Sequence, residues 1–476
     1  MNIDFFGSLP LIVIWLALGA VGIAIQAFVR NNTRLIFGYY VATLVATAVL
    51  AIITAGHKSI AFNGMVALGG FSNYFDVLFC GAGLMTMMAA RPYLQRENAE
   101  IDEFYTLLVS AVSGMMFMSH ANNLLVLFVG VELMSISFYV MAGFLRTNSR
   151  SIEAGLKYFL LGAFASGFLV YGMALIYGAT GSLQYDVIAS HIATGQVNFP
   201  ALLSIGAVLM AVALGFKVAA FPFHQWAPDV YEGAPSVVTA FMSTAGKAAA
   251  FASFIMVFAA LMPHGNVLTP KLQNMLALVS AITMLIGNIT AIAQTNVKRM
   301  LAYSSVAHAG YLLMGIVANS DQGSMAVVFY VTSYVFMQLG AFVVVGILER
   351  GNEQHLQISD YAGLAKRQPV LAFAMAVFMF ALAGIPPLAG FFGKYLLFVS
   401  AIESGFLWLT LVAVLSSVIS AYFYLGLIVK MYFSESQGHH EPNPAGMAGI
   451  TLVVAATASI VLGLFTTQLL SVYGSW

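Results

Sequence analysis

The stretch GFKVAAFPFHQWAPDVYEGAP, residues 215–235, sets a lysine among apolar residues and follows it with two prolines. Lys217 lies in an apolar run long enough to cross about 30 Å of hydrocarbon. A charged side chain at that depth costs roughly 2.5–3.5 kcal/mol on insertion scales. Pro222 and Pro228 each remove a backbone hydrogen bond from a helix, so they predict an interrupted helix whose freed polar groups need other partners. A costly charge beside a helix break indicates a functional site at membrane depth.

The composition extends this reading to the whole chain of 476 residues. Hydrophobic residues make up 61%, charged residues only 8%, and the mean hydropathy is +0.92. These values exclude an ordinary soluble domain. Apolar runs recur without strand alternation, which predicts an all-α polytopic membrane protein rather than a β-barrel. Cys80 is the only cysteine, which excludes an internal disulfide and a cysteine-ligated metal cluster.

Short polar breaks divide the chain into about fourteen transmembrane helices, of which the seventh and the twelfth are interrupted. The predicted spans are 8–29, 33–54, 73–90, 104–119, 121–144, 155–178, 200–232, 236–262, 270–292, 299–318, 322–348, 368–402, 405–431 and 444–470.

The distribution of basic residues sets the orientation. With the N-terminus outside, the cytoplasmic connections carry twelve Lys and Arg residues and the opposite face carries two, Lys58 and Lys271. This asymmetry follows the positive-inside rule, so both termini are predicted on the outer side. The twelve are Arg30, Arg34, Arg91, Arg96, Arg146, Arg150, Lys298, Arg299, Arg350, Lys366, Arg367 and Lys430.

The other four of the eighteen basic residues fall inside spans, and all are lysines: Lys157, Lys217, Lys247 and Lys394. Lysine can gain and lose a proton as its surroundings change, whereas arginine stays charged. Glu132 lies at the middle of the fifth span and is the expected carboxylate partner of Lys217. Lys157 lies near a span end, one helical turn after Glu153, so a structural ion pair is the alternative reading there.

A second helix break predicts an internal repeat. Pro386 and Pro387 interrupt the twelfth span just before Lys394, five spans after the first break. Five is odd, so a tandem five-helix unit enters the membrane from the opposite side the second time, and broken helices at corresponding places indicate an ion path. We therefore predict two inverted five-helix repeats with flanking helices. The segments are 1–103 (spans 1–3), 104–264 (spans 4–8), 265–435 (spans 9–13) and 436–476 (span 14).

Several long motifs, in order along the chain, resemble the antiporter-like membrane subunits of NADH:quinone oxidoreductase, respiratory complex I. They are GVELMS, the opening stretch, STAGKAAAF, QTNVKRMLAYSSVAHAGYLLMG and LAGIPPLAGFFGKYLLF. Within this family the chain is most similar to the N-type subunits. The L and M subunits and the Mrp antiporters differ after the tryptophan of WAPDVYEGAP, and M subunits typically have glutamate where this chain has Lys394.

The resemblance implies proton translocation and assigns roles along a path. Glu132 and Lys217 are the pair that a neighbouring subunit controls, Lys247 is the central relay, Lys394 is the outer terminal carrier and Lys157 is a connecting lysine. His308 is a candidate bridge between the halves with its neighbours Tyr303, Ser304 and Ser305, because imidazole both donates and accepts hydrogen bonds. Packing is the alternative for His308. The break is lined by His224 and Trp226, and Asp229 and Glu232 lie at the cytoplasmic mouth.

The resemblance also implies partners and cofactors. The chain itself is expected to hold no redox centre and no metal. NADH or ferredoxin, FMN, iron–sulfur clusters and quinone are expected in other subunits. Expected partners are a neighbouring antiporter-like subunit, small membrane subunits and the lipid bilayer of the bacterial inner membrane, and no nucleic acid. The exposed pair His439–His440 has only a weak claim as a ligand site.

Three alternatives stay open at this stage: a Mrp-type cation/proton antiporter subunit, a ferredoxin-linked complex I relative, and a structural membrane subunit that conducts nothing. Charges inside the spans argue against the structural subunit. WAPDVYEGAP and Lys394 argue against the antiporter.

Overall fold

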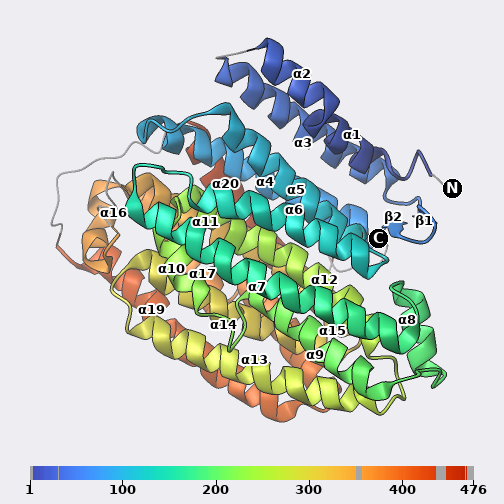
Figure 1. Ribbon diagram of the computed structural model, residues 1–476. Helices are drawn as coiled ribbons and strands as arrows, with labels where there is room; N and C mark the ends of the chain where they lie inside the picture. Colours follow the sequence, from blue (N-terminus) through green and yellow to red (C-terminus); the bar gives the residue numbers. More distant parts are fainter. Residues whose placement is uncertain (1–3, 30–31, 350–355, 436–445, 467, 469–476) are drawn as a thin grey trace.

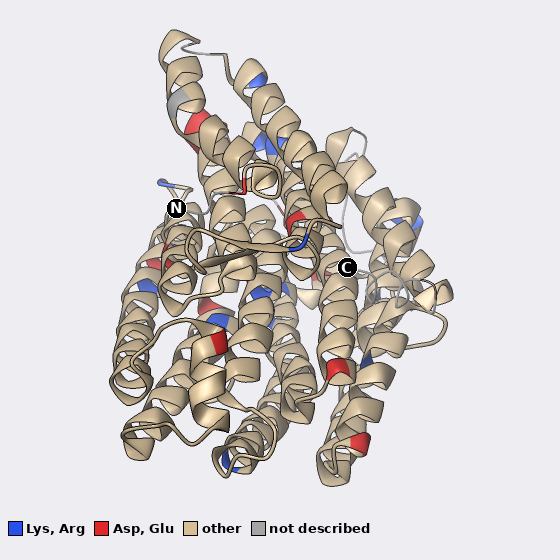
Figure 2. Cartoon of the chain, turned by 90° about the vertical axis from the view of Figure 1, so that its right-hand side faces the viewer, with Lys and Arg blue, Asp and Glu red and all other residues tan. Residues whose placement is uncertain are grey.

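The protein is a bundle of long helices lying side by side, with the N-terminal helices along one edge (Figure 1). The computed structural model describes residues 4–29, 32–349, 356–435, 446–466 and 468. Within these residues, twelve helical stretches are long and apolar enough to cross a membrane. Figure 2 shows how few charged residues the helices carry and that several of these lie along the helices rather than at their ends.

The helices and strands fall into three groups along the chain. The first contains α1 (Leu9–Leu18), α2 (Ala20–Phe28), α3 (Thr33–Thr54), β1 (Ser59–Ala61), β2 (Val66–Leu68) and α4 (Phe71–Arg96). The second contains α5 (Asp102–His120), α6 (Leu124–Ala142), α7 (Ser149–Thr180), α8 (Tyr185–Ala193), α9 (Pro200–Val218), α10 (Trp226–Gly233), α11 (Ser236–Phe241), the π-helix η1 (Met242–Gly246) and α12 (Lys247–Leu261). The third contains α13 (Leu268–Ile292), α14 (Val297–Ala318), α15 (Asp321–Leu348), the 3-10 helix η2 (Ile358–Tyr361), α16 (Leu364–Arg367), α17 (Pro369–Ala383), α18 (Ala389–Glu403), α19 (Leu407–Phe433) and α20 (Met447–Leu464).

Each of the fourteen predicted spans overlaps one helix or consecutive helices of this series, and the last, 444–470, lies partly outside the described residues. The spans 104–119 and 368–402 are not among the twelve stretches. Three further features differ from the prediction. The first span is divided at Gly19, a residue that weakens a helix because it has no side chain to restrict the backbone. The connection 179–199 contains the amphipathic helix α8, and the connection after α3 forms the antiparallel hairpin β1–β2. Strands of three residues are too short to show an alternating pattern.

The interior of the bundle is formed by α14 and α15, whose apolar windows are 94% and 89% buried. Helix α13 packs closely on α14 because glycines lie at the contact. A Cβ at Gly287 would lie 2.5 Å from the amide nitrogen of Ala307, and one at Gly310 would lie 2.8 Å from that of Met284. Small residues therefore bring these two backbones together, as is common between membrane helices.

Charged side chains connect separate segments of the chain at two places. At one end, Asp4 contacts His57 at 2.7 Å and accepts a hydrogen bond from Ser59, which ties the N-terminal segment to the hairpin. Hydrogen bonds from Ser59 and from the amide of Gly7 lower the pKa of Asp4 to about 2, so it is ionised at neutral pH. Elsewhere Arg96 of α4 donates to carbonyls at the C-terminus of α15, where the helix leaves them without partners.

Candidate functional site

The predicted interruption of the seventh span lies between α9 and α10. Ala219 takes a left-handed conformation with φ of 60°, and Pro222 lies in the turn that follows. The indole of Trp226 donates to the carbonyl of Phe216 at 3.0 Å, which supplies a partner for one freed backbone group. Pro228 was expected to break the helix, and that prediction is wrong. It is the third residue of α10, where the amide has no intrahelical partner to lose.

Lys217 is buried beside this break, at the C-terminal end of α9, with 7% of its surface exposed. Its Nζ donates to Ser135 Oγ at 2.8 Å and to the Tyr139 hydroxyl at 3.3 Å. Glu132 precedes Ser135 by three residues on α6 and accepts a hydrogen bond from Ser166. No ion pair joins Glu132 to Lys217 in the described part of the chain, so their pairing stays a prediction.

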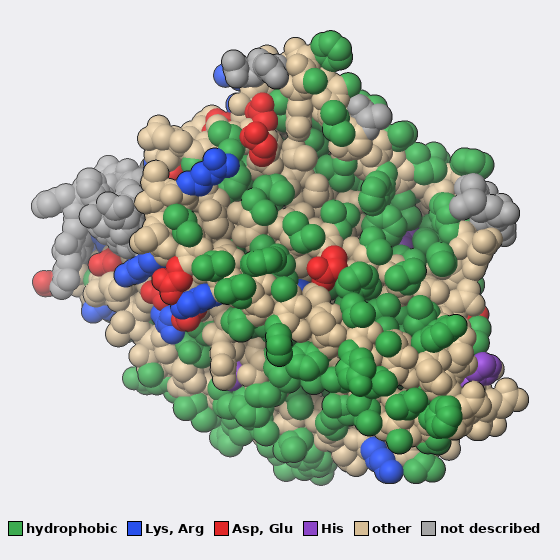
Figure 3. Space-filling model, viewed as in Figure 1, with side chains coloured by type: hydrophobic (Ala, Val, Ile, Leu, Met, Phe, Trp, Pro, Cys, Tyr) green, Lys and Arg blue, Asp and Glu red, His purple; other side chains and the backbone are tan. Residues whose placement is uncertain are grey.

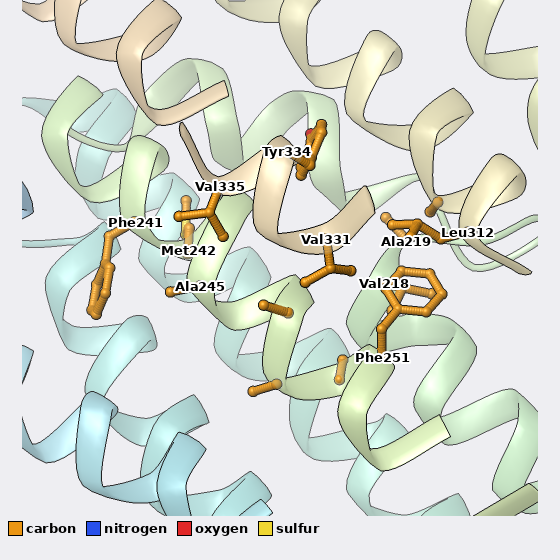
Figure 4. Close-up of a cluster of buried hydrophobic side chains, with 14 of the residues drawn as sticks. Val218, Ala219, Phe241, Met242, Ala245, Phe251, Leu312, Val331, Tyr334 and Val335 are labelled. Carbon is orange, nitrogen blue, oxygen red and sulfur yellow. The ribbon is translucent and has the colours of Figure 1, made fainter. Parts of the chain in front are cut away.

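Lys247 directly follows the π-helix η1 and is 1% exposed. Its Nζ donates to both the carbonyl and the hydroxyl of Ser305, each at 2.6 Å. A single turn of π-helix inside an α-helix is frequent at functional sites. A cluster of buried apolar side chains includes Val218, at the end of α9, and Met242, in η1 (Figure 4).

His308 lies at the centre of a buried hydrogen-bonded line. Its Nδ1 contacts the Tyr330 hydroxyl at 2.6 Å and its Nε2 contacts the Tyr424 hydroxyl at 3.0 Å. Tyr424 also bonds to the hydroxyl of Ser304, the residue before the partner of Lys247. The structure thus joins His308 with Ser304 as predicted, but Tyr303 is half-buried and forms no part of this line.

The second interruption separates α17 from α18. Gly384 has φ of 85°, and Pro386 and Pro387 lie in the turn, as predicted. Lys394, 4% exposed, donates to the carbonyl of Ala383 at 3.1 Å, so it contacts the last residue of α17 across the break. The lysine precedes the break in one span and follows it in the other, which agrees with the prediction.

Two further groups contact Lys394, and a hydrogen bond from Asn288 holds one of them. Its Nζ donates to Ser417 Oγ at 2.9 Å and lies 4.8 Å from the centre of the Tyr311 ring. The Tyr311 hydroxyl accepts a hydrogen bond from Asn288 at 3.2 Å, and Asn288 also donates to Ser416 at 2.7 Å. A cation over an aromatic face gains about 0.5–2 kcal/mol, so this tyrosine stabilises the ammonium without a counter-charge.

Lys157 lies apart from the buried lysines. Its side chain is 42% exposed and forms ion pairs with Glu153 at 2.6 Å and Asp229 at 3.0 Å. Arg299 contacts Asp229 at 2.9 Å and Glu232 at 2.7 Å. The expected charged mouth is therefore a network of ion pairs at the surface of the bundle.

The sequence did not reveal the hydroxyl and ring partners of the lysines. Tyr139 contacts Lys217 from α6 and Tyr311 contacts Lys394 from α14, whereas the two tyrosines bonded to His308 come from α15 and α19. In the sequence of an apolar span, a tyrosine that only packs cannot be distinguished from one that forms a hydrogen bond. One signal in the sequence could have indicated these partners. A hydroxyl residue three or four positions from a charged residue lies on the same face of a helix, as Ser135 does with Glu132.

This arrangement can carry protons. Serine, tyrosine and histidine all both donate and accept hydrogen bonds, so a proton can pass along them by exchange of donors and acceptors. The contacts given above place hydroxyl, carbonyl and ring groups around the buried lysines. Among the described residues, no group of three or more His, Cys, Asp or Glu side chains is placed to bind a metal. His439–His440 lies outside the described residues.

Comparison with known proteins agrees with this arrangement. The family model described as NADH:quinone oxidoreductase/Mrp antiporter, TM, matches residues 121–420. NADH-quinone oxidoreductase subunit N 1 of Chloroherpeton thalassium is 44% identical over 410 residues, which is 86% of this chain and 85% of the relative. Subunit N of Trichlorobacter lovleyi is 41% identical over 96% of this chain and 94% of its own length.

Solved structures give the same fold. A chain of respiratory complex I from Thermus thermophilus with bound aureothin superposes with a TM-score of 0.83 at 33% identity, over 97% of this chain and 99% of that chain. A chain of the Mrp complex from Dietzia has a TM-score of 0.83 at 22% identity, over 99% and 97% of the two chains. At that identity the Mrp likeness concerns the fold alone. The chain belongs to the family of NADH-quinone oxidoreductase N subunits.

Proposed function

We propose that this chain is a proton-translocating membrane subunit of an NADH-quinone oxidoreductase, in which quinone reduction in other subunits drives protons along its buried lysines. The observation that carries the proposal is the series of buried ammonium groups with hydroxyl, carbonyl and ring partners. Lys247 contacts Ser305, the neighbouring Ser304 contacts Tyr424, and Tyr424 contacts His308. A chain that only filled space in the membrane would gain nothing from these costly groups.

In this proposal, Glu132 and Lys217 form the entry pair. Glu132 favours the charged form of Lys217, and movement of the carboxylate lets the lysine pass its proton onward. Lys247 receives the proton, His308 and its tyrosines relay it, and Lys394 releases it toward the outer side. Lys157 is a connecting lysine between adjacent units.

The remaining assignments of the proposal concern architecture. The two breaks belong to inverted repeats, 104–264 and 265–435, flanked by 1–103 and 436–476. The chain lies in a bacterial inner membrane with both termini on the periplasmic side, since the basic residues favour that orientation. Its partners are other membrane subunits of the complex, and NADH or ferredoxin, FMN, iron–sulfur clusters and quinone belong to other subunits.

Substitution of Lys394 tests the proposal. In the complete complex reconstituted into vesicles, Lys394→Ala is expected to reduce proton translocation by at least about tenfold, the effect of ~1.4 kcal/mol on a barrier. Lys394→Arg should fail as well, because arginine does not release its proton. Unchanged proton translocation in both variants, with the complex assembled, would contradict the path.

A further inference from the structure

Two buried polar atoms of α15 have no hydrogen-bond partner among the described residues. They are the hydroxyl oxygen of Tyr334 and Oε1 of Gln338, and the two side chains are 1% and 0% exposed. Tyr334 lies in the buried apolar cluster with Val331 and Val335, which offer no polar group (Figure 4). Hydrophobic side chains also cover most of the face of the molecule in Figure 3, where charged side chains gather toward the left. Buried polar atoms are costly without partners, so these two need one.

Both groups lie on the face of α15 that packs against α14, since positions four apart share a side of a helix. The ring centre of Tyr334 lies 5.1 Å from that of His308, and the Gln338 amide donates to the carbonyl of Leu301 at 3.1 Å. A carbonyl only accepts, so this contact identifies the donating end of the amide and leaves Oε1 as a free acceptor. Ser305 lies between Leu301 and His308 on the same face of α14.

Ser305 brings a third hydroxyl to this place. The hydroxyls of Tyr334 and Tyr231 both adjoin Ser305, in a geometry that leaves the Tyr334 hydroxyl without a direct hydrogen bond. Ser305 Oγ accepts a hydrogen bond from Nζ of Lys247 at 2.6 Å, so the serine hydrogen points away from the lysine. Hydroxyl groups and one amide oxygen thus meet one step from Lys247.

We propose that one water molecule binds here and joins Tyr334, Gln338 and Ser305. Water meets both needs, because it accepts from a tyrosine hydroxyl and donates to an amide oxygen. An anion cannot donate to Oε1. A cation cannot accept from the hydroxyl, and it is repelled by the ammonium of Lys247, which already contacts Ser305. A buried water typically has about three partners, as this one does.

The water lets Ser305 serve both protonation states of Lys247. When the lysine is charged, Nζ donates to Ser305 Oγ and the serine hydrogen goes to the water. When the lysine is neutral, the serine donates to Nζ and the water donates to Ser305 Oγ. Only the direction of the hydrogen bonds reverses, which requires a partner that both donates and accepts. This role rests on the proposed function of Lys247, whereas the water site itself does not.

A cryo-EM map of the complete complex tests the site, at a resolution that shows buried water elsewhere in this chain. One water peak is expected about 2.5–3.0 Å from both the Tyr334 hydroxyl oxygen and Gln338 Oε1. A direct hydrogen bond between the two side chains would overturn the site. Apolar atoms that fill the space, with no peak between the two oxygens, would overturn it as well.

Two substitutions test the role of the water. Tyr334→Phe removes the hydroxyl and keeps the ring, and Gln338→Leu removes the fixed acceptor. Each is expected to slow proton translocation by the complex in sealed vesicles by about tenfold, because Ser305 then lacks its reversible partner. The control is Gln273→Leu on α13. Gln273 also donates to a helix carbonyl, that of Val317 at 2.8 Å, and its loss should leave the rate unchanged.

The double variant distinguishes one shared water from two independent effects. Tyr334→Phe combined with Gln338→Leu should be no slower than the slower single variant, because each change already removes the water. A rate reduced by the product of the two single effects would overturn the role of the water, and so would normal rates in both single variants. The proposed function fails by a different result, normal proton translocation in Lys247→Ala.

Discussion

Lys217, Lys247 and Lys394 are buried alike but held by different partners. Lys217 donates to two hydroxyls, Lys247 to a serine through both its carbonyl and its hydroxyl, and Lys394 to a carbonyl and a hydroxyl with a ring beside it. The lysines themselves could be predicted from the sequence, because a charge inside an apolar span is conspicuous. Their partners could not be, because serine and tyrosine are unremarkable in membrane helices and come together only through packing between distant segments.

Tyr424 is the residue whose loss should interrupt the relay most selectively. Tyr424→Phe removes one hydroxyl that contacts both His308 and Ser304 and leaves the ring in place. The line then lacks the hydroxyl between His308 and Ser304, and proton translocation should fall roughly tenfold, the effect of about 1.4 kcal/mol on a barrier. The measurement is acidification of reconstituted vesicles during quinone reduction.

The control for this substitution is Tyr422→Phe. Tyr422 lies on the same helix with 71% of its surface exposed, and its loss should leave the rate unchanged. Equal rates for the two variants would exclude Tyr424 from the relay.

At the scale of elements, the two helix breaks were predictable and their geometry was not. Prolines indicated both interruptions, yet Pro228 lies inside α10 and the turn of the chain occurs at Ala219 and Pro222. The π-helix before Lys247 was not predicted, and the helices on both sides of it, α11 and α12, pack against α15. The hairpin and α8 escaped prediction because each is too short for a clear hydrophobic period.

Gly384 tests whether the second break positions Lys394. With φ of 85° it has a conformation that costs other residues about 1–2 kcal/mol, and a Cβ there would lie 3.1 Å from Lys394 Cδ. Gly384→Ala should lower the thermal stability of the complex and slow proton translocation. Gly426→Ala is the control, since a Cβ at Gly426 meets no atom within 4 Å. Identical melting temperatures and rates for both variants would show that the turn has no such role.

For the whole molecule, the sequence predicted an all-α polytopic membrane protein because hydrophobic length alone indicates that class, although twelve helical stretches of the described residues, against about fourteen predicted spans, are long and apolar enough to cross a membrane. It could not predict which helices lie inside the bundle. Burial of α14 and α15 depends on close contacts such as those at Gly287 and Gly310. Orientation rests on the distribution of basic residues, which is a statement about insertion rather than about packing.

Labelling of introduced cysteines tests the orientation. Lys58→Cys is expected to react with a membrane-impermeant maleimide in cells with a permeable outer membrane, and Lys366→Cys only after the inner membrane is opened. Cys80 is fully buried and should give little background. The reverse pattern would place the termini on the cytoplasmic side.

The central claim, that protons cross this chain through its buried lysines, is tested most directly at Lys247, in the middle of the path. Two quantities are measured for the complete complex in sealed vesicles: the rate of proton translocation and the number of protons translocated per electron transferred. The control is Lys271→Ala, which replaces an exposed lysine on α13. Lys247→Ala and Lys247→Arg are both expected to reduce proton translocation by at least about tenfold, while the control keeps the normal rate and ratio. Normal rates and ratios in both Lys247 variants would contradict the account.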